Sequence, residues 1–136
     1  MNAIFFYKIG KFLYNCKIPI LPKFFSSLNY LLFHCYLPCS ATIGRDTKLG
    51  YGGLGIVIHA RAVIGNNVII GQNVTIGGRS GNYDVPIIGN NVYIGAGAKI
   101  LGPVHVGDNS KIGANAVVIK DVPANTIAVG VPAIIK

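Results

Sequence analysis

The sequence contains very few acidic side chains. Among its 136 residues there is no glutamate, and the only aspartates are Asp46, Asp84, Asp108 and Asp121. A glycosidase that works with paired carboxylates, or a carboxylate cage for calcium or magnesium, is therefore nearly excluded. The three cysteines all precede residue 40 and are odd in number. They do not form a disulfide framework, and we expect reduced thiols in a cytoplasmic chain.

Basic side chains outnumber acidic ones, and the formal net charge is +8. Lysine and arginine form no dense run of the kind that nucleic-acid-binding arms carry, so no nucleic acid is expected as a partner. Residues 1–40 hold four lysines, no acidic residue and ten of the thirteen aromatic residues. Composition thus divides the chain into an N-terminal segment, residues 1–38, and a second unit, residues 39–136.

The N-terminal segment shows the apolar periodicity of two amphipathic helices. Phe5, Ile9 and Phe12 recur at helical spacing, and a second helical pattern runs from Phe24 to Pro38. Residues 24–39 are too few and too polar for a transmembrane span, and no signal-peptide cleavage pattern is evident. Two roles stay open. The helices pack on the rest of the protein or a sister subunit, or residues 4–36 make peripheral contact with the cytoplasmic face of the membrane.

After Pro38 the sequence repeats every six residues. The pattern Ile/Val-Gly-x-Asn begins at residues 64, 70, 88, 106 and 112, so that successive positions differ by 6 or 18. Such a hexad predicts a short strand followed by a turn with positive φ, and three strands would form one triangular coil of about 18 residues. We therefore expect an all-β solenoid, a parallel β-helix whose stacked coils bury one apolar column per corner.

Two interruptions break the repeat. Three extra residues enter within residues 50–55, between Leu49 and Ile58. Residues 80–85 fill one hexad without its apolar pattern, which predicts a loop extruded from a corner. Irregular segments on a regular scaffold are where function is expected.

Several motifs of the repeat resemble the hexapeptide-repeat acyltransferases of the serine acetyltransferase type. They are Gly-Ile-Val-Ile-His-Ala-Arg-Ala-Val-Ile-Gly at residues 55–65, Val-Thr-Ile-Gly-Gly at 74–78, the run at 92–102 and Val-Gly-Val-Pro-Ala at 129–133. The resemblance covers residues 41–136. It implies a left-handed β-helix, a homotrimer with active sites between subunits, and acetyl-CoA as donor.

The acceptor is inferred from the N-terminus. A short basic and aromatic N-terminus resembles family members associated with bacterial surface polysaccharides, whereas serine acetyltransferases of cysteine biosynthesis carry a much longer helical domain. The expected activity is acetyl-CoA-dependent O-acetylation of a sugar hydroxyl in surface polysaccharide biosynthesis. Serine as acceptor, an aminosugar nitrogen and a non-catalytic scaffold remain alternatives. No metal is expected, because a zinc anhydrase would need three histidines and the spacing of His59 and His105 does not fit 18-residue coils.

Acetyl transfer needs a base that accepts the proton of the acceptor. His59 is the first candidate, with a structural or substrate-orienting role as its alternative, and His105 is expected to be an exposed strand residue. In the family that the chain resembles, the catalytic histidine precedes the equivalent of Gly55 by a few residues, and Tyr51 is nearest that position here. Tyr51 is therefore a second candidate. The extruded loop of related enzymes often contributes a histidine, and residues 80–85 contain none.

Acetyl transfer also needs residues that stabilise the oxyanion of the tetrahedral intermediate and residues that bind acetyl-CoA. Backbone N–H groups of Gly77 and Gly78 are the candidates for the oxyanion, and the alternative is that both glycines only turn a corner. The phosphates of CoA call for basic side chains, and its pantetheine arm calls for small residues. The candidates for binding acetyl-CoA are Arg79, Ala96, Gly97, Lys99, Lys111, Ala114 and Lys120.

Overall fold

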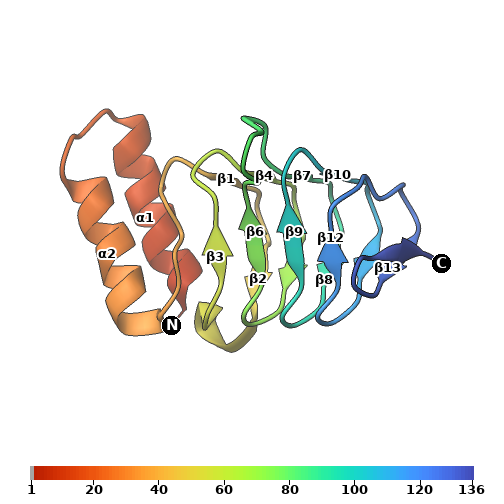
Figure 1. The fold of residues 1–136 in the computed structure, drawn as a ribbon. Helices are drawn as coiled ribbons and strands as arrows, with labels where there is room; N and C mark the ends of the chain where they lie inside the picture. The colour runs from red at the N-terminus through yellow and green to blue at the C-terminus, as the bar shows by residue number, and fades with distance from the viewer. Residues whose placement is uncertain (1) are drawn as a thin grey trace.

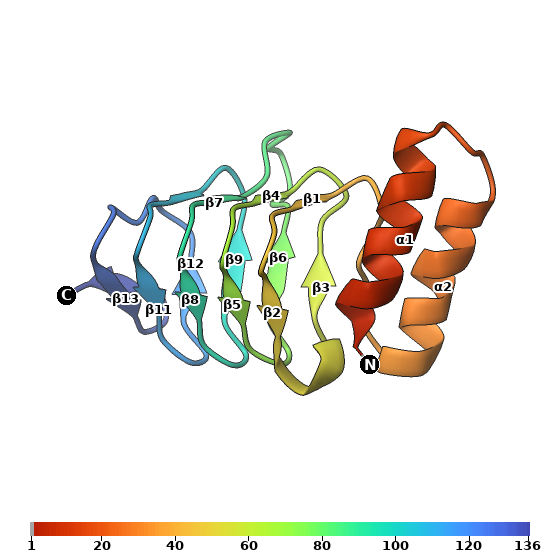
Figure 2. The same cartoon turned by 180° about the vertical axis from the view of Figure 1, so that it is seen from behind.

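The computed structural model describes residues 2–136 as two helices lying against one end of a three-sided β-solenoid (Figure 1, Figure 2). Helix α1 spans Ala3–Asn15 and helix α2 spans Leu21–Phe33. The chain then visits three sheets in turn. The β1 sheet stacks β1 (Thr42–Ile43), β4 (Val63–Ile64), β7 (Ile87–Ile88) and β10 (His105–Val106). The β3 sheet stacks β3 (Val57–Ile58), β6 (Thr75–Gly77), β9 (Lys99–Leu101) and β12 (Val117–Val118).

The β2 sheet is the longest of the three. It stacks β2 (Lys48–Leu49), β5 (Ile69–Ile70), β8 (Tyr93–Ile94), β11 (Lys111–Ile112), β13 (Ile127–Val129) and β14 (Ile134–Ile135). All pairings between coils are parallel, and among residues 2–136 only the pairing of β13 with β14 is antiparallel. The parallel β-helix expected from the six-residue repeat is therefore confirmed.

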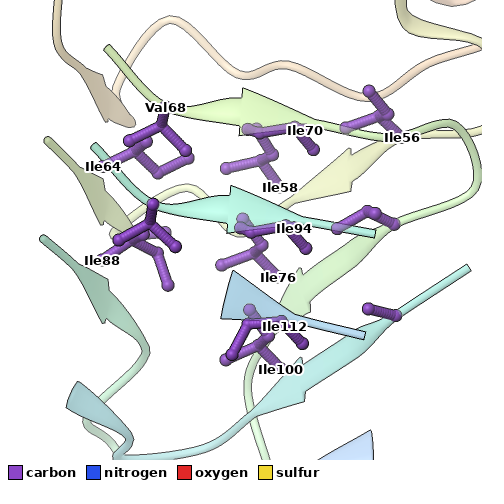
Figure 3. Packing of buried hydrophobic residues seen from close by; sticks show 14 of the residues in the cluster. Ile56, Ile58, Ile64, Val68, Ile70, Ile76, Ile88, Ile94, Ile100 and Ile112 are labelled. Carbon is purple, nitrogen blue, oxygen red and sulfur yellow. The ribbon is translucent and has the colours of Figure 1, made fainter. Parts of the chain in front are cut away.

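The apolar columns expected from the repeat form the core. Ile58, Ile76 and Ile100 stack in the β3 sheet, and their counterparts in the other sheets do the same (Figure 3). These three side chains have no exposed surface. Burial of each contributes about 1.5–3 kcal/mol, so the solenoid is stabilised by coil-on-coil contacts repeated along its length.

Asparagine and glycine have separate roles in the repeat. Asn67 and Asn91 have φ of 55° and 57°, in the left-handed region that asparagine tolerates. Gly65 lies outside that region, but a Cβ on it would lie 2.5 Å from Asn90 Oδ1 and 2.6 Å from Gly89 O. Positive φ is thus confirmed at the asparagines, whereas the glycine is required because neighbouring coils approach closely.

Both interruptions of the repeat leave the solenoid where the sequence predicts. Residues Gly50–Gly53 form a kinked 3-10 segment, η1, before β3, with Tyr51 and Gly52 outside helical φ/ψ. Residues 80–85 contain no strand and rise from the corner between β6 and β7 as the green loop at the top of Figure 1. The rest of the coil continues in register past this loop, because β4 pairs directly with β7.

The helices bury a different face from the one their apolar pattern suggests. In α1 the buried residues are Ala3, Tyr7 and Gly10, while Phe5 and Phe12 are 53% and 68% exposed. Small residues on the buried face let α1 pack closely, since a Cβ on Gly10 would collide with the Cys39 sulfur. The aromatic stripe therefore points away from the solenoid. Pro22 lies in the first turn of α2, where its missing N–H leaves no helical hydrogen bond unmade.

Tyr7 fixes α1 to the first coil. Its hydroxyl donates to Ala41 O at 2.7 Å and accepts from the backbone N–H of Ile43 at 3.1 Å. Burial raises the pKa of Tyr7 to about 12, whereas a tyrosine in an unfolded chain titrates near 10. The folded state therefore favours the neutral phenol. This contribution to stability is complete below about pH 10 and is lost as the pH rises through about 12.

We expect the free energy of unfolding to fall by roughly 2–3 kcal/mol between about pH 10 and 12 through Tyr7. Burial also raises the pKa of Cys35 to about 11, so Tyr7→Phe should reduce the fall without abolishing it. Urea titrations followed by circular dichroism at several alkaline pH values measure this. Tyr30→Phe, at an exposed tyrosine, is the control. An equal fall in Tyr7→Phe and wild type would contradict the assignment.

Candidate active site

His59 and Gly78 lie side by side at one corner of the solenoid. His59 directly follows β3 and Gly78 directly follows β6, and the parallel pairing of these strands brings the two residues together. A Cβ on Gly78 would lie 3.5 Å from His59 Cδ2 and 3.7 Å from His59 Nε2. Because Gly78 has no side chain, space remains beside Nε2. We call this the His59 corner and define it as residues 59–62, 78–86, 102–104 and 119–121.

A backbone hydrogen bond sets the protonation of the His59 ring. Nδ1 accepts a hydrogen bond from the backbone N–H of Arg61 at 3.1 Å. Nδ1 therefore carries no proton, and in the neutral imidazole the proton lies on Nε2. A neutral base must offer an unprotonated nitrogen, whereas His59 presents an N–H donor to the space beside Gly78. This geometry favours the substrate-orienting alternative for His59 over the role of base.

Neither conformation nor packing requires glycine at positions 77 and 78. Both lie outside the positive-φ region, so the backbone turn does not depend on them being glycine. A Cβ on Gly77 would make ordinary contacts, 3.4 Å from Thr75 Cγ2 and 3.6 Å from a methyl of Leu101. Glycines at these positions leave the backbone open to close approach by a ligand or a neighbouring copy. This observation supports a binding role beside His59.

Arg61 and Tyr83 hold the extruded loop against the same corner. Neither residue was predicted from the sequence to belong to the site. The Arg61 guanidinium carbon lies 4.0 Å from the centroid of the Tyr83 ring, and Nη2 donates to the Tyr83 backbone oxygen. A hollow of about 380 Å³ lies beside them, with Asp84 and the exposed His105 in its wall. The available signal was that Tyr83 is the one aromatic residue of the interruption.

Tyr51 lies at a different corner. It belongs to η1, before β3, whereas His59 follows β3, so the strand separates the two within one chain. Figure 1 shows the corresponding turn at the bottom of the solenoid and the extruded loop at the top. Tyr51 is 80% exposed and holds φ 48° and ψ 42°, a conformation that bulky residues rarely adopt. Within one copy of the chain, Tyr51 and His59 therefore lie at different corners and do not form one site.

The candidates for binding acetyl-CoA divide between regions of the solenoid. Arg79 and Lys120 lie at the His59 corner, and Arg79 packs over Gly102. Lys99 begins β9 and donates to Asn73 O at 2.6 Å. The corner between the β2 and β3 sheets carries Ala96, Gly97 and Ala114, and Lys111 lies on β11. One chain therefore does not gather all of them around a single cavity. Within residues 2–136 no three His, Cys, Asp or Glu side chains lie close enough to hold a metal ion.

Two family descriptions match the repeat. Bacterial transferase hexapeptide (six repeats) matches residues 86–120, and the hexapeptide repeat of succinyl-transferase matches residues 67–87. The repeat of this chain is therefore similar to that of hexapeptide-repeat transferases. Its solenoid is the left-handed parallel β-helix that the resemblance implied.

Serine acetyltransferases are similar to the chain along nearly all of its length. That of Escherichia coli strain K12 is 43% identical over 134 residues, which are 97% of this chain and 49% of the relative. That of Synechococcus elongatus is 37% identical over 134 residues, which are 96% of this chain and 54% of the relative. Soybean serine acetyltransferase complexed with serine has a TM-score of 0.92 at 37% identity, covering 98% of this chain and 56% of that one. The chain spans about half the length of these relatives.

Another similar structure holds coenzyme A. The serine acetyltransferase from Brucella abortus in complex with coenzyme A has a TM-score of 0.93 at 36% identity. It covers 98% of this chain and 54% of that one. Because the match includes the N-terminal helices, the segment that pointed toward polysaccharide-associated members is itself similar to serine acetyltransferases. The polysaccharide assignment is therefore not supported.

Proposed function

We propose that the chain is an acetyl-CoA-dependent O-acetyltransferase that acts on the hydroxyl of L-serine. The observation that carries this proposal is the similarity to serine acetyltransferases over 96–98% of the chain, with solved relatives that hold serine and coenzyme A. The space beside His59 and Gly78 supports it independently, because the oxyanion of an acyl transfer needs fixed N–H donors, and the His59 ring and the Gly78 backbone can each supply one.

The roles follow from the geometry of the corner. The serine Oγ attacks the thioester carbon, the C–S bond breaks, the serine proton passes to the departing thiolate, and O-acetylserine and CoA form. His59 donates its Nε2 proton in a hydrogen bond to the oxygen that becomes negative in the tetrahedral intermediate, next to the backbone N–H of Gly78. Donors of this kind are worth about 10²–10³ in rate.

A homotrimer is part of the proposal. Tyr51 and His59 lie at opposite ends of β3, so a complete site needs Tyr51 from a neighbouring copy, where it contacts the acceptor hydroxyl. Arg79 and Lys120 meet CoA phosphates at the His59 corner. The pantetheine arm runs past small residues, and further contacts come from the other coils. The remaining candidates for these contacts are Ala96, Gly97, Lys99, Lys111 and Ala114.

The test is release of CoA from acetyl-CoA, followed with a thiol-reactive dye, after calorimetry has established that acetyl-CoA binds. We expect release that depends on L-serine and that is absent with D-serine. Binding without release in the presence of L-serine would remove serine as the acceptor. Absence of acetyl-CoA binding would overturn the proposed function as a whole.

A further inference from the structure

The outer side of the helical layer is apolar and exposed. On α1, Phe5 and Phe12 lie opposite the buried Ala3, Tyr7 and Gly10, and both are more than half exposed. On α2, Phe24 and Leu31 are 55% and 71% exposed, and they lie opposite the buried Pro22 and Asn29. Figure 1 and Figure 2 show both helices at one end of the solenoid. We define the cap face by Phe5, Lys8, Phe12, Lys23, Phe24 and Leu31.

The charge of the cap face has one sign. Lys8 lies between Phe5 and Phe12 on the same stripe of α1, and Lys23 precedes Phe24 on α2; both lysines are exposed. No acidic residue occurs before Asp46, so nothing in the helical layer neutralises these lysines. Large apolar side chains interspersed with lysines, without any acid, match a surface that is apolar inside and anionic outside.

The helices are too short to cross such a surface. Each has 13 residues, about 20 Å of helix, and a span needs about 20 apolar residues. Within residues 2–136, neither helix is long and apolar enough to pass through a bilayer. An orientation that lies flat, with aromatic side chains among the acyl chains and lysines at the phosphates, fits both the length and the pattern.

We propose that the cap face docks the protein on an anionic lipid bilayer. A second copy fits this face poorly, because self-association would bring Lys8 and Lys23 against their own counterparts with no acidic partner. A bilayer that contains anionic phospholipid satisfies the apolar and the basic side chains together. The inference does not depend on the identity of the acetyl acceptor.

A groove links the cap face to the His59 corner. Its volume is about 930 Å³, and its wall includes Lys17 and Lys23 from the helical layer and Ala60, the residue next to His59. In Figure 1 the connection between α1 and α2 lies on the same side of the molecule as the extruded loop. Docking therefore places the His59 corner near the lipid headgroups, with the two groove lysines on the phosphate side.

Vesicle flotation with the full chain tests the proposal. We expect binding to vesicles of phosphatidylcholine with phosphatidylglycerol, little binding to phosphatidylcholine alone, and weaker binding as salt increases. The double variant Lys8→Gln/Lys23→Gln should lower the partition coefficient about 10–30-fold. Phe12→Ser/Phe24→Ser should lower it at least about 10-fold on both kinds of vesicle. The control Lys48→Gln/Lys136→Gln removes the same charge from two exposed lysines outside the cap face and the candidate site, and should leave binding within about threefold of wild type.

Circular dichroism and thermal unfolding show whether each variant is folded, and the exposed positions of all the changes should leave both unchanged. Failure of the folded wild type to bind anionic vesicles would overturn the proposal. So would an equal loss in the cap-face and control lysine variants. Self-association that Phe12→Ser/Phe24→Ser abolishes, without vesicle binding, would assign the cap face to a second copy. Because acetyl-CoA binding is measured separately, failure here leaves the proposed activity untouched.

Discussion

Replacing His59 by alanine should lower kcat/KM for acetyl transfer about 100-fold and leave the affinity for acetyl-CoA nearly unchanged. The reason is the position of Nε2, which carries a proton and faces the space beside Gly78 because Nδ1 accepts from Arg61. Steady-state kinetics with L-serine and calorimetry with acetyl-CoA measure the two quantities. Full activity of His59→Ala would remove His59 from the reacting centre.

His59→Gln separates a donor from a base. A glutamine amide donates a hydrogen bond but does not accept a proton at neutral pH. If His59 is a donor, His59→Gln should recover activity to within about tenfold of wild type. If His59 is the base, His59→Gln should be as inactive as His59→Ala. Recovery with glutamine is the outcome we expect.

Gly55→Val should lower the free energy of unfolding by about 3 kcal/mol or more. Gly55 has φ of +69°, and a Cβ on it would collide with the Asn73 side chain of the next coil. Its N–H also donates to His34 O at 2.9 Å, so the turn joins α2 to the solenoid. Urea unfolding followed by circular dichroism measures the change.

Gly81→Val is the matched control for Gly55→Val. Gly81 also has positive φ, +85°, but a Cβ there would meet nothing within 4 Å. Gly81→Val should therefore lower the free energy of unfolding by only about 1 kcal/mol, from backbone strain alone. The difference between the variants isolates the contact between coils. Equal destabilisation would show that strain, and not close packing, explains why glycine stands at position 55.

The regular part of the fold could be predicted because each coil repeats the same local rule. Ile58, Ile76 and Ile100 recur at multiples of six, and the structure stacks them as expected. The buried face of α1 could not be predicted in this way. Periodicity identified the stripe of Phe5 and Phe12. Which face of α1 is buried, however, depends on contacts with residues distant in sequence, such as the hydrogen bond from Tyr7 to Ala41.

The candidate site was predicted in part. The repeat places Gly77 one coil after His59, with Gly78 as the next residue, and the pairing of β3 with β6 brings His59 and Gly78 together. The tautomer of His59 depends on the backbone N–H of Arg61, which no spacing rule shows. The contact between Arg61 and Tyr83 depends on the path of an irregular loop, for which the repeat supplies no template.

Direct detection of the product tests the central claim, which is acetyl transfer from acetyl-CoA to serine. The chain is incubated with L-serine and acetyl-CoA that is labelled with carbon-13 at the carbonyl, and the carbonyl signals are followed by NMR. The account predicts that the thioester signal is replaced by that of an O-acetylserine ester, at a rate that His59→Ala reduces about 100-fold. Conversion to free acetate alone, or an unchanged thioester with acetyl-CoA bound, would contradict it.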